Sequence, residues 1–197
     1  MAFWSDATVS DPKRQHRWLV SIGAPELSSY ISYVCKGVAK PKMTIGEAEH
    51  KFINHTFYYP GGVTYDPITL TLVDPANPSS TQALYDLIQV SGYRLPDNII
   101  NANPGASPSG QNADVSTISK SKGVKALTSV VITQMDGDGN TVEEITLKNA
   151  WIKSVDFGGD LNYENEGLVE ISLELRFDWF NMVTPSNLLG YDPRGDS

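Results

Sequence analysis

A strict alternation of apolar and polar side chains in residues 168–180 constrains the fold of this chain more than any other feature. One set of alternate positions carries Val169, Ile171, Leu173, Leu175, Phe177 and Trp179. The positions between them carry Glu170, Ser172, Glu174, Arg176 and Asp178. Successive side chains of a strand point to opposite faces, whereas a helix repeats about every 3.6 residues. The segment therefore predicts one long β-strand with a single buried face.

Shorter segments with a strand-like pattern predict the rest of a β-protein. They comprise residues 17–22, 30–39, 51–59, 68–73, 128–135, 141–148 and 151–157. Pro60, Gly61 and Gly62 are expected to end the third of these segments, and the glycine-containing run 136–140 predicts a hairpin loop.

Residues 80–91 stand out because they have helical spacing. Ser79 is followed three residues later by Gln82, which is a capping-box pattern, and Gly92 stands where a glycine commonly ends a helix. The predicted fold class is mostly β: two packed antiparallel sheets, as a sandwich or barrel-like pair, with one flanking α-helix.

The length of 197 residues predicts a single domain over 1–197, with a core at about 17–180. We expect an N-terminal arm at 1–16, a long polar loop at 95–122 and a C-terminal extension at 181–197. The loop is rich in Asn, Gly, Ser and Pro and has little to bury. No apolar run reaches the ~20 residues that cross a bilayer, so we expect no membrane anchor.

The sequence contains few residues in patterns typical of catalytic or metal-binding sites. His50 and His55 are an odd number of positions apart, so on one strand they would face opposite ways, and Cys35 is the single cysteine. The run 136–140 resembles the start of a calcium loop, but Thr141 and Leu147 replace its glycine and its glutamate. We therefore expect no metal, no cofactor and no enzyme. An acid pair among Glu143, Glu144, Glu164 and Glu166 stays open as a third reading.

The net charge of −8 excludes a protein that grips nucleic acid by its phosphates, since such binding needs a positive patch.

Several segments together, in this order, resemble the tail tube proteins of contractile-tailed bacteriophages, a family related to pyocin tubes and to the tube ring of type VI secretion. They are TYDPITLTL at 64–72, LYD at 84–86, EITLKNAW at 144–151, VDF at 155–157 and EISLELRFDW at 170–179. The resemblance covers about residues 18–180. It leaves open a phage, a bacteriocin or a secretion system, and a contractile or a non-contractile tail.

The resemblance implies a structural subunit of two packed sheets flanked by a helix. Copies would form hexameric rings that stack into a hollow tube, through which double-stranded DNA passes during ejection without specific binding. The implied partners are further copies of the chain and the sheath, baseplate and tail terminator proteins. The implied location is the virion tail, assembled in the host cytoplasm.

Two sets of residues are candidates for this assembly. Glu170, Glu174 and Asp178 are candidates for an acidic lumen wall that repels DNA, the alternative being an ordinary solvated strand face.

The region 43–62 contains many apolar side chains for a segment that connects strands. The resemblance implies an arm that reaches another subunit, and the alternative is a hairpin packed on its own core. The interface candidates are Ile45, Phe52, Phe57, Tyr58 and Tyr59, with Phe3 and Trp4 as weaker ones.

A different class of function also fits the sequence. A monomeric β-sandwich that binds carbohydrate or a receptor would have the same strand pattern. Self-assembly separates it from a tube subunit, because a binding module is expected to stay monomeric.

Overall fold

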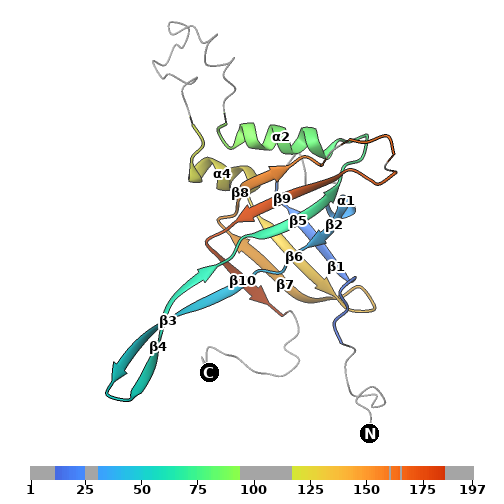
Figure 1. Cartoon of the computed structure of the whole chain (residues 1–197). Coiled ribbons are helices and arrows are strands. Elements are labelled where there is room, and N and C mark those ends of the chain that lie inside the picture. Colours follow the sequence, from blue (N-terminus) through green and yellow to red (C-terminus); the bar gives the residue numbers. More distant parts are fainter. Residues whose placement is uncertain (1–11, 25–30, 94–116, 160, 165, 185–197) are drawn as a thin grey trace, which may run out of the picture.

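Two four-stranded antiparallel sheets face each other across one apolar core in the computed structural model (Figure 1), which describes residues 12–24, 31–93, 117–159, 161–164 and 166–184. The first sheet has the order β1-β6-β7-β10, formed by Trp18–Ile22, Val130–Met135, Thr141–Lys148 and Trp179–Val183. The second has the order β2-β5-β9-β8, formed by Cys35–Val38, Ile68–Val73, Glu170–Arg176 and Trp151–Asp156. The predicted fold class is confirmed.

The register of the second sheet explains why the alternation in the sequence is so regular. The apolar residues of β5 lie directly opposite those of β9, and each is at most 1% exposed: Ile68 faces Leu175, Leu70 faces Leu173 and Leu72 faces Ile171. Burying such a side chain stabilises the fold by roughly 1.5–3 kcal/mol. These pairs pack against the inner face of the first sheet, which contributes Val20, Ile22, Val130, Ile132, Ile145 and Leu147.

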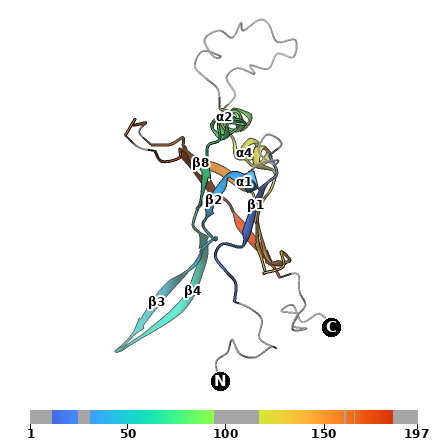
Figure 2. The ribbon, with the colours of Figure 1, turned by 90° about the vertical axis from the view of Figure 1, so that its right-hand side faces the viewer.

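The helices α2 (Ser80–Val90) and α4 (Lys120–Leu127) lie side by side at one end of the sandwich (Figures 1 and 2). The prediction of α2 is confirmed: the side chain of Ser79 accepts a hydrogen bond from the Gln82 amide, and Gly92 has the left-handed φ of 104°. The Gln82 side chain donates to Asp86 instead of returning to the cap.

The helix α4 was not predicted. It begins in the last three residues of the segment expected to be a loop at 95–122 and continues to Leu127, and Ser119 caps it by accepting from the Lys122 amide at 3.3 Å. Its buried residues are only Gly123, Ala126 and Leu127, which is too short an apolar stripe to give a clear helical period. Residues 95–116 of the predicted loop lie outside the described residues.

A two-stranded hairpin, β3 (Met43–Phe52) and β4 (His55–Tyr65), projects away from the two sheets (Figures 1 and 2). The prediction of one strand at 51–59 is wrong, because the chain turns at Ile53 and Asn54 in the middle of it. Pro60, Gly61 and Gly62 do not end the strand either. They lie within β4, where the register shifts opposite Gly46. Such a bulge accommodates glycine within a strand.

Two other predicted strands are each divided. The segment 30–39 begins as the short helix α1 (Ile31–Val34) and becomes the strand β2 only at Cys35. The segment 168–180 is divided into β9 and β10, because the chain crosses from the second sheet to the first at Phe177 and Asp178. The Asp178 amide already donates to the Lys148 carbonyl of the first sheet at 3.1 Å. Strands that change sheets in this way form the corners of sandwiches.

The crossing also changes which side chains point inward. Phe177 is buried, but Trp179 is 47% exposed, and Phe180 takes the inward position on β10. The predicted apolar face therefore ends at Phe177. The strand β10 continues to Val183, which lies in the region expected to be a C-terminal extension; residues 185–197 are outside the described part.

Candidate assembly surfaces

The hairpin β3–β4 exposes an unusual amount of apolar surface. Every residue of both strands is exposed except the half-buried Tyr65. The five interface candidates all lie on it and are 50–63% exposed: Ile45, Phe52, Phe57, Tyr58 and Tyr59. The hairpin therefore does not pack on its own core. Contiguous apolar patches of this kind mark interaction surfaces in soluble proteins.

The strand register divides the hairpin into two faces, since residues directly opposite each other share a face. The glutamate face is defined here as Met43, Ile45, Glu47, Glu49 and Lys51 with Thr56, Tyr58, Pro60, Val63 and Tyr65. The aromatic face is defined as Thr44, Ala48, His50 and Phe52 with His55, Phe57, Tyr59 and Thr64. The interface candidates are thus spread over both faces, with Phe57 and Tyr58 pointing in opposite directions.

His50 and His55 lie on the same face of the hairpin, so the prediction that they face opposite ways is wrong. His50 is opposite Phe57 and His55 is opposite Phe52, because the turn at Ile53 and Asn54 places the two histidines on different strands. A count along one strand does not apply across a turn. In the described part of the chain, no three His, Cys, Asp or Glu side chains gather to hold a metal ion.

Each of the three candidate lumen carboxylates has a lysine partner. Glu170 pairs with Lys36, Glu174 with Lys153 at 2.8 Å, and Asp178 with Lys120 at 2.7 Å. Hydrogen bonds from Lys153 and Ser154 lower the pKa of Glu174, and hydrogen bonds from Lys120 and Asn149 lower that of Asp178. Each of the three carboxylates is therefore locally balanced by a positive charge.

The structure brings only two of these acids onto one face. Glu170 and Glu174 project from the outer face of the second sheet, alongside Thr69, Thr71, Ser172 and Ser154. Asp178 lies beyond the end of β9 and is bonded to the helix α4 through Lys120. Among the described residues on the outer face of the second sheet, three cations offset three anions: Lys36, Lys153 and Arg176 against Asp156, Glu170 and Glu174.

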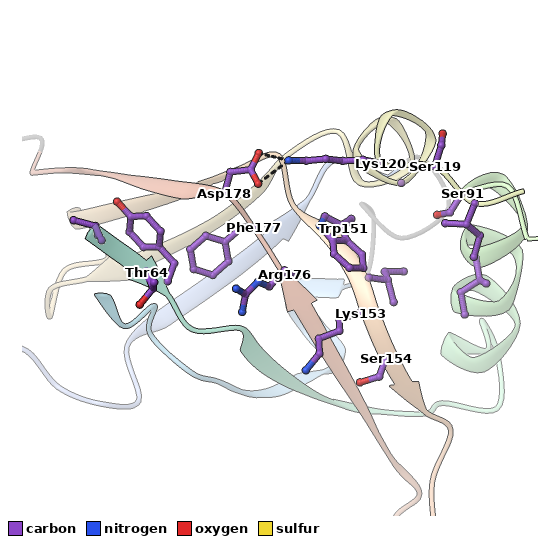
Figure 3. Close-up of a pocket in the computed structure, with 16 residues that line it drawn as sticks. Thr64, Ser91, Ser119, Lys120, Trp151, Lys153, Ser154, Arg176, Phe177 and Asp178 are labelled. Carbon is purple, nitrogen blue, oxygen red and sulfur yellow. Dashed lines mark hydrogen bonds and ion pairs between the residues drawn. The ribbon is translucent and has the colours of Figure 1, made fainter. Parts of the chain in front are cut away.

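A groove of about 760 Å³ runs from the helices α2 and α4 across β8 to the foot of the hairpin (Figure 3). Trp151, Phe177 and Tyr65 give it apolar walls. Trp151 lies directly opposite Arg176 on the neighbouring strand. No sequence pattern indicated this groove, because its walls come from five separate segments of the chain.

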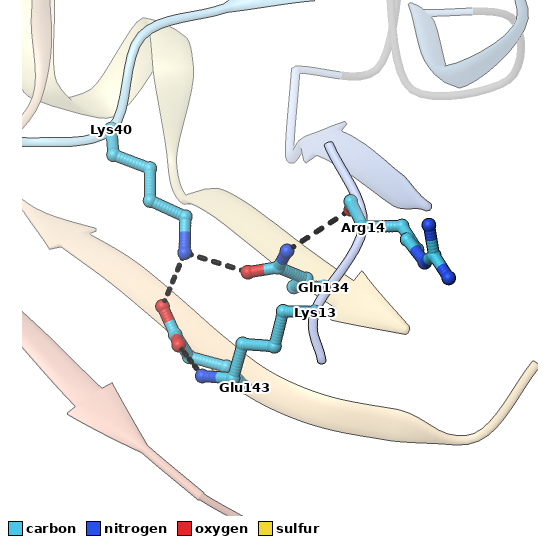
Figure 4. Close-up of polar contacts among 5 residues, drawn as sticks. All are labelled: Lys13, Arg14, Lys40, Gln134 and Glu143. Atoms are coloured by element: carbon cyan, nitrogen blue, oxygen red, sulfur yellow. Dashed lines mark hydrogen bonds and ion pairs between the residues drawn. The ribbon is translucent and has the colours of Figure 1, made fainter. Parts of the chain in front are cut away.

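The N-terminal segment is tied to the first sheet through Glu143 (Figure 4). The Glu143 carboxylate, 8% exposed, accepts hydrogen bonds from Lys13 and from Lys40, the latter at 2.8 Å. The Gln134 side chain donates to the Arg14 carbonyl at 3.3 Å and accepts from Lys40 at 2.7 Å. This cluster joins residues 13 and 14 to the segment that leads into the hairpin. Phe3 and Trp4 lie outside the described residues.

The Glu143 cluster also bears on the acid-pair reading. Burial raises the pKa of the Glu143 carboxyl, but hydrogen bonds from Lys13 and Lys40 and their charges outweigh burial, so the pKa lies below its ordinary value of 4.5. A carboxylate held ionised by two lysines is poorly suited to act as a general acid. Its neighbour Glu144 points to the opposite face of β7.

No helix in the described ranges combines the length and apolar character needed to span a bilayer.

No protein-family model matches the sequence, and no curated protein matches it. Solved structures do match the fold. A chain of the anti-feeding prophage baseplate, six-fold symmetrised, superimposes with a TM-score of 0.60 at 16% identity, covering 89% of this chain and 98% of that chain.

Two structures of an extracellular contractile injection system, PVC, are similar to the same degree. A chain of its sheath/tube terminator in the extended state has a TM-score of 0.61 at 14% identity, with 90% of this chain and 100% of that chain covered. A chain of its sheath-tube complex has a TM-score of 0.59 at 15% identity, with 89% and 94% covered. The three structures are of a baseplate and of two parts of a contractile injection system rather than of enzymes. The chain therefore has the tail-tube fold that its sequence resemblance implied, shared with chains of this baseplate and of this injection system.

Proposed function

We propose that this chain is a structural, non-enzymatic subunit of a phage tail tube. Copies form hexameric rings, and the rings stack into a hollow conduit through which DNA passes during ejection. The observation that carries the proposal is the hairpin β3–β4, an exposed apolar arm on a chain with the tail-tube fold. An arm of this kind has no role in a lone sandwich but is suited to a contact between copies.

The arm supplies the contact between subunits through Ile45, Phe52, Phe57, Tyr58 and Tyr59, all of them exposed. Aromatic side chains are common at the energetic centres of such interfaces. Phe3 and Trp4 add a second contact. A hexamer agrees with the six-fold symmetry of the similar baseplate assembly.

The part of the outer face of the second sheet around Glu170, Thr71 and Ser172, away from the groove, lines the lumen, with Glu174 and Asp178 at its edge. The lysine partners of these acids make that wall nearly neutral as well as polar. A surface of balanced charge binds DNA weakly, because it offers no excess of cations to replace the counterions of the phosphates. The DNA therefore slides without being held.

The remaining partners are a sheath, a baseplate and a tail terminator, which are the kinds of assembly in which the similar structures occur. The location is the tail of a virion, assembled in the host cytoplasm. No cofactor takes part.

Negative-stain electron microscopy of the purified protein over a range of concentration and salt tests the assembly. We expect rings or stacked tubes. The double substitution Phe57→Ala plus Tyr58→Ala is expected to abolish them and to leave a folded monomer by circular dichroism. The matched control Thr44→Ala plus Thr56→Ala changes one exposed residue on each face and is expected to assemble normally. Wild-type protein that stays monomeric in every condition contradicts the proposal and favours a monomeric binding module.

The lumen assignment has its own test. Replacing Glu170, Glu174 and Asp178 by Lys in one triple variant gives a strongly positive wall, which is expected to slow DNA ejection. Unchanged ejection from tails built with this variant would place these residues elsewhere on the tube.

A further inference from the structure

We propose that the groove of one copy receives the hairpin of another, with the glutamate face of the arm against Trp151 and Arg176. This inference rests on the proposed self-assembly and adds the surface on which the arm docks. The occupant is a second copy of this chain.

The side chains that line the groove favour a partner surface that is apolar and carries negative charge. Its walls are formed by Trp151, Phe177 and Tyr65, and its charged groups include Lys120, Lys153 and Arg176. Lys120 and Lys153 already have carboxylate partners, Asp178 and Glu174. The Arg176 guanidinium, by contrast, forms no ion pair in the described part of the chain beyond a longer-range charge interaction with Glu174, and it is exposed on the residue directly opposite Trp151.

The glutamate face of the hairpin has the matching chemistry. Tyr58 lies directly opposite Glu49, and Glu47 is the next residue along on the same face. Among the described residues, Glu47 forms no ion pair, and Glu49 has only a long contact of 3.7 Å with Lys51. An aromatic ring flanked by two carboxylates therefore stands exposed on the arm. It fits a groove that offers an aromatic wall and an exposed guanidinium.

The geometry of the arm requires that the contact be made between copies. The groove includes Val63, Thr64 and Tyr65 at the foot of β4, whereas Tyr58 lies seven positions closer to the tip. At about 3.3 Å per residue, an extended strand places Tyr58 about 23 Å beyond Tyr65. The arm therefore does not reach its own groove. Because donor and acceptor surfaces differ and both belong to one chain, the contact can run head-to-tail, which closes into rings or continues as a tube.

A charge exchange tests the pairing directly. Glu47→Lys and Arg176→Glu are each expected to raise the protein concentration for half-maximal assembly, followed by light scattering, by about tenfold. The double variant restores the opposite charges and is expected to assemble within about threefold of wild type. Glu164→Lys and Lys125→Glu are matched controls, because they make similar charge changes at exposed positions outside both surfaces. A double variant no better than the single ones overturns the pairing.

A second measurement leaves every charge in place. A photo-reactive benzoylphenylalanine at position 58 is expected to cross-link to residues 151–153 or 176 of another copy, as mapped by mass spectrometry. Intermolecular cross-links elsewhere overturn the groove assignment and leave the tube proposal standing. If position 58 cross-links to the groove only when residues 95–116 are deleted, those residues occupy the groove in the full chain, which also overturns the inference. A chain that forms neither assemblies nor intermolecular cross-links contradicts both proposals.

Discussion

The rings of Tyr65 and Phe180 meet edge to face, with their centroids 5.7 Å apart and their planes at 81°. Tyr65 is the last residue of β4, and Phe180 lies on β10 just after the chain has crossed between the sheets. Phe177, at the crossing itself, completes the cluster at 6.0 Å from Tyr65 and 6.4 Å from Phe180. The exposed arm is thus anchored at the corner of the sandwich, and its direction depends on these three rings.

Replacing Tyr65 with Ala is expected to lower the free energy of unfolding of the monomer by about 2 kcal/mol, because it removes two aromatic contacts and part of the packing around Phe177. Tyr58→Ala, on the same strand but 63% exposed, is the matched control and is expected to change that free energy by less than about 0.5 kcal/mol. Urea unfolding at a concentration below assembly measures both. Equal effects would mean that Tyr65 does not anchor the arm.

Glu143 is expected to make the protein sensitive to acid. Its pKa is lowered in the folded state, so its contribution to stability is fully present above its unfolded value near 4.5 and is lost as the pH falls through the lower folded value. Glu143→Gln is expected to cost about 1.5 kcal/mol at pH 7 and to weaken the pH dependence of stability below pH 4.5.

The same variant reports on the N-terminal segment. Hydrogen exchange at residues 12–17 is expected to speed up in Glu143→Gln, since Lys13 loses its carboxylate partner. The control is Glu144→Gln, which alters the neighbouring residue on the opposite face of β7. Unchanged exchange in both variants would show that Glu143 does not hold this segment.

Asp74 is expected to matter more for the start of helix α2 than the N-cap serine itself. Its carboxylate accepts from the Ser80 amide at 2.7 Å, the Thr81 hydroxyl at 2.6 Å and the Thr81 amide at 3.3 Å, whereas the Ser79 hydroxyl accepts one bond of 3.3 Å. We expect Asp74→Ala to cost about 2 kcal/mol and Ser79→Ala about 0.5 kcal/mol in thermal or urea unfolding. The reverse order would contradict this assignment.

Two glycines separate the effect of backbone strain from that of a close contact. Gly92 and Gly139 both have a left-handed φ, at 104° and 84°. A Cβ at Gly92 would lie 2.8 Å from the Thr117 carbonyl oxygen, while one at Gly139 would meet no atom within 4 Å. Gly139→Ala is therefore expected to cost about 1 kcal/mol, and Gly92→Ala about 3 kcal/mol. Equal costs in urea unfolding would mean that the Thr117 backbone moves away freely.

Much of the fold was predictable from local patterns. The strands β1, β5, β6, β7 and β8 lie where the sequence predicts strands, and α2 begins at its predicted cap. These elements each bury one face, so the period of their side chains reports the buried face directly. The candidate site was predictable only in part: the exposed aromatics of the arm were found, but the groove and the cluster around Glu143 were not.

The sequence by itself therefore determined the β-sandwich class, the inward residues of β9 and the capped helix. Only the tertiary structure decided where strands end and which sheet they join. The segment 51–59 contains a turn and the segment 168–180 changes sheets at Phe177, yet both keep a strand-like pattern. The physical reason is that side-chain period depends on one strand and its own two faces, whereas pairing depends on partners far away in the chain. Lys40 and Glu143, or Trp151 and Arg176, meet only after those partners are in place.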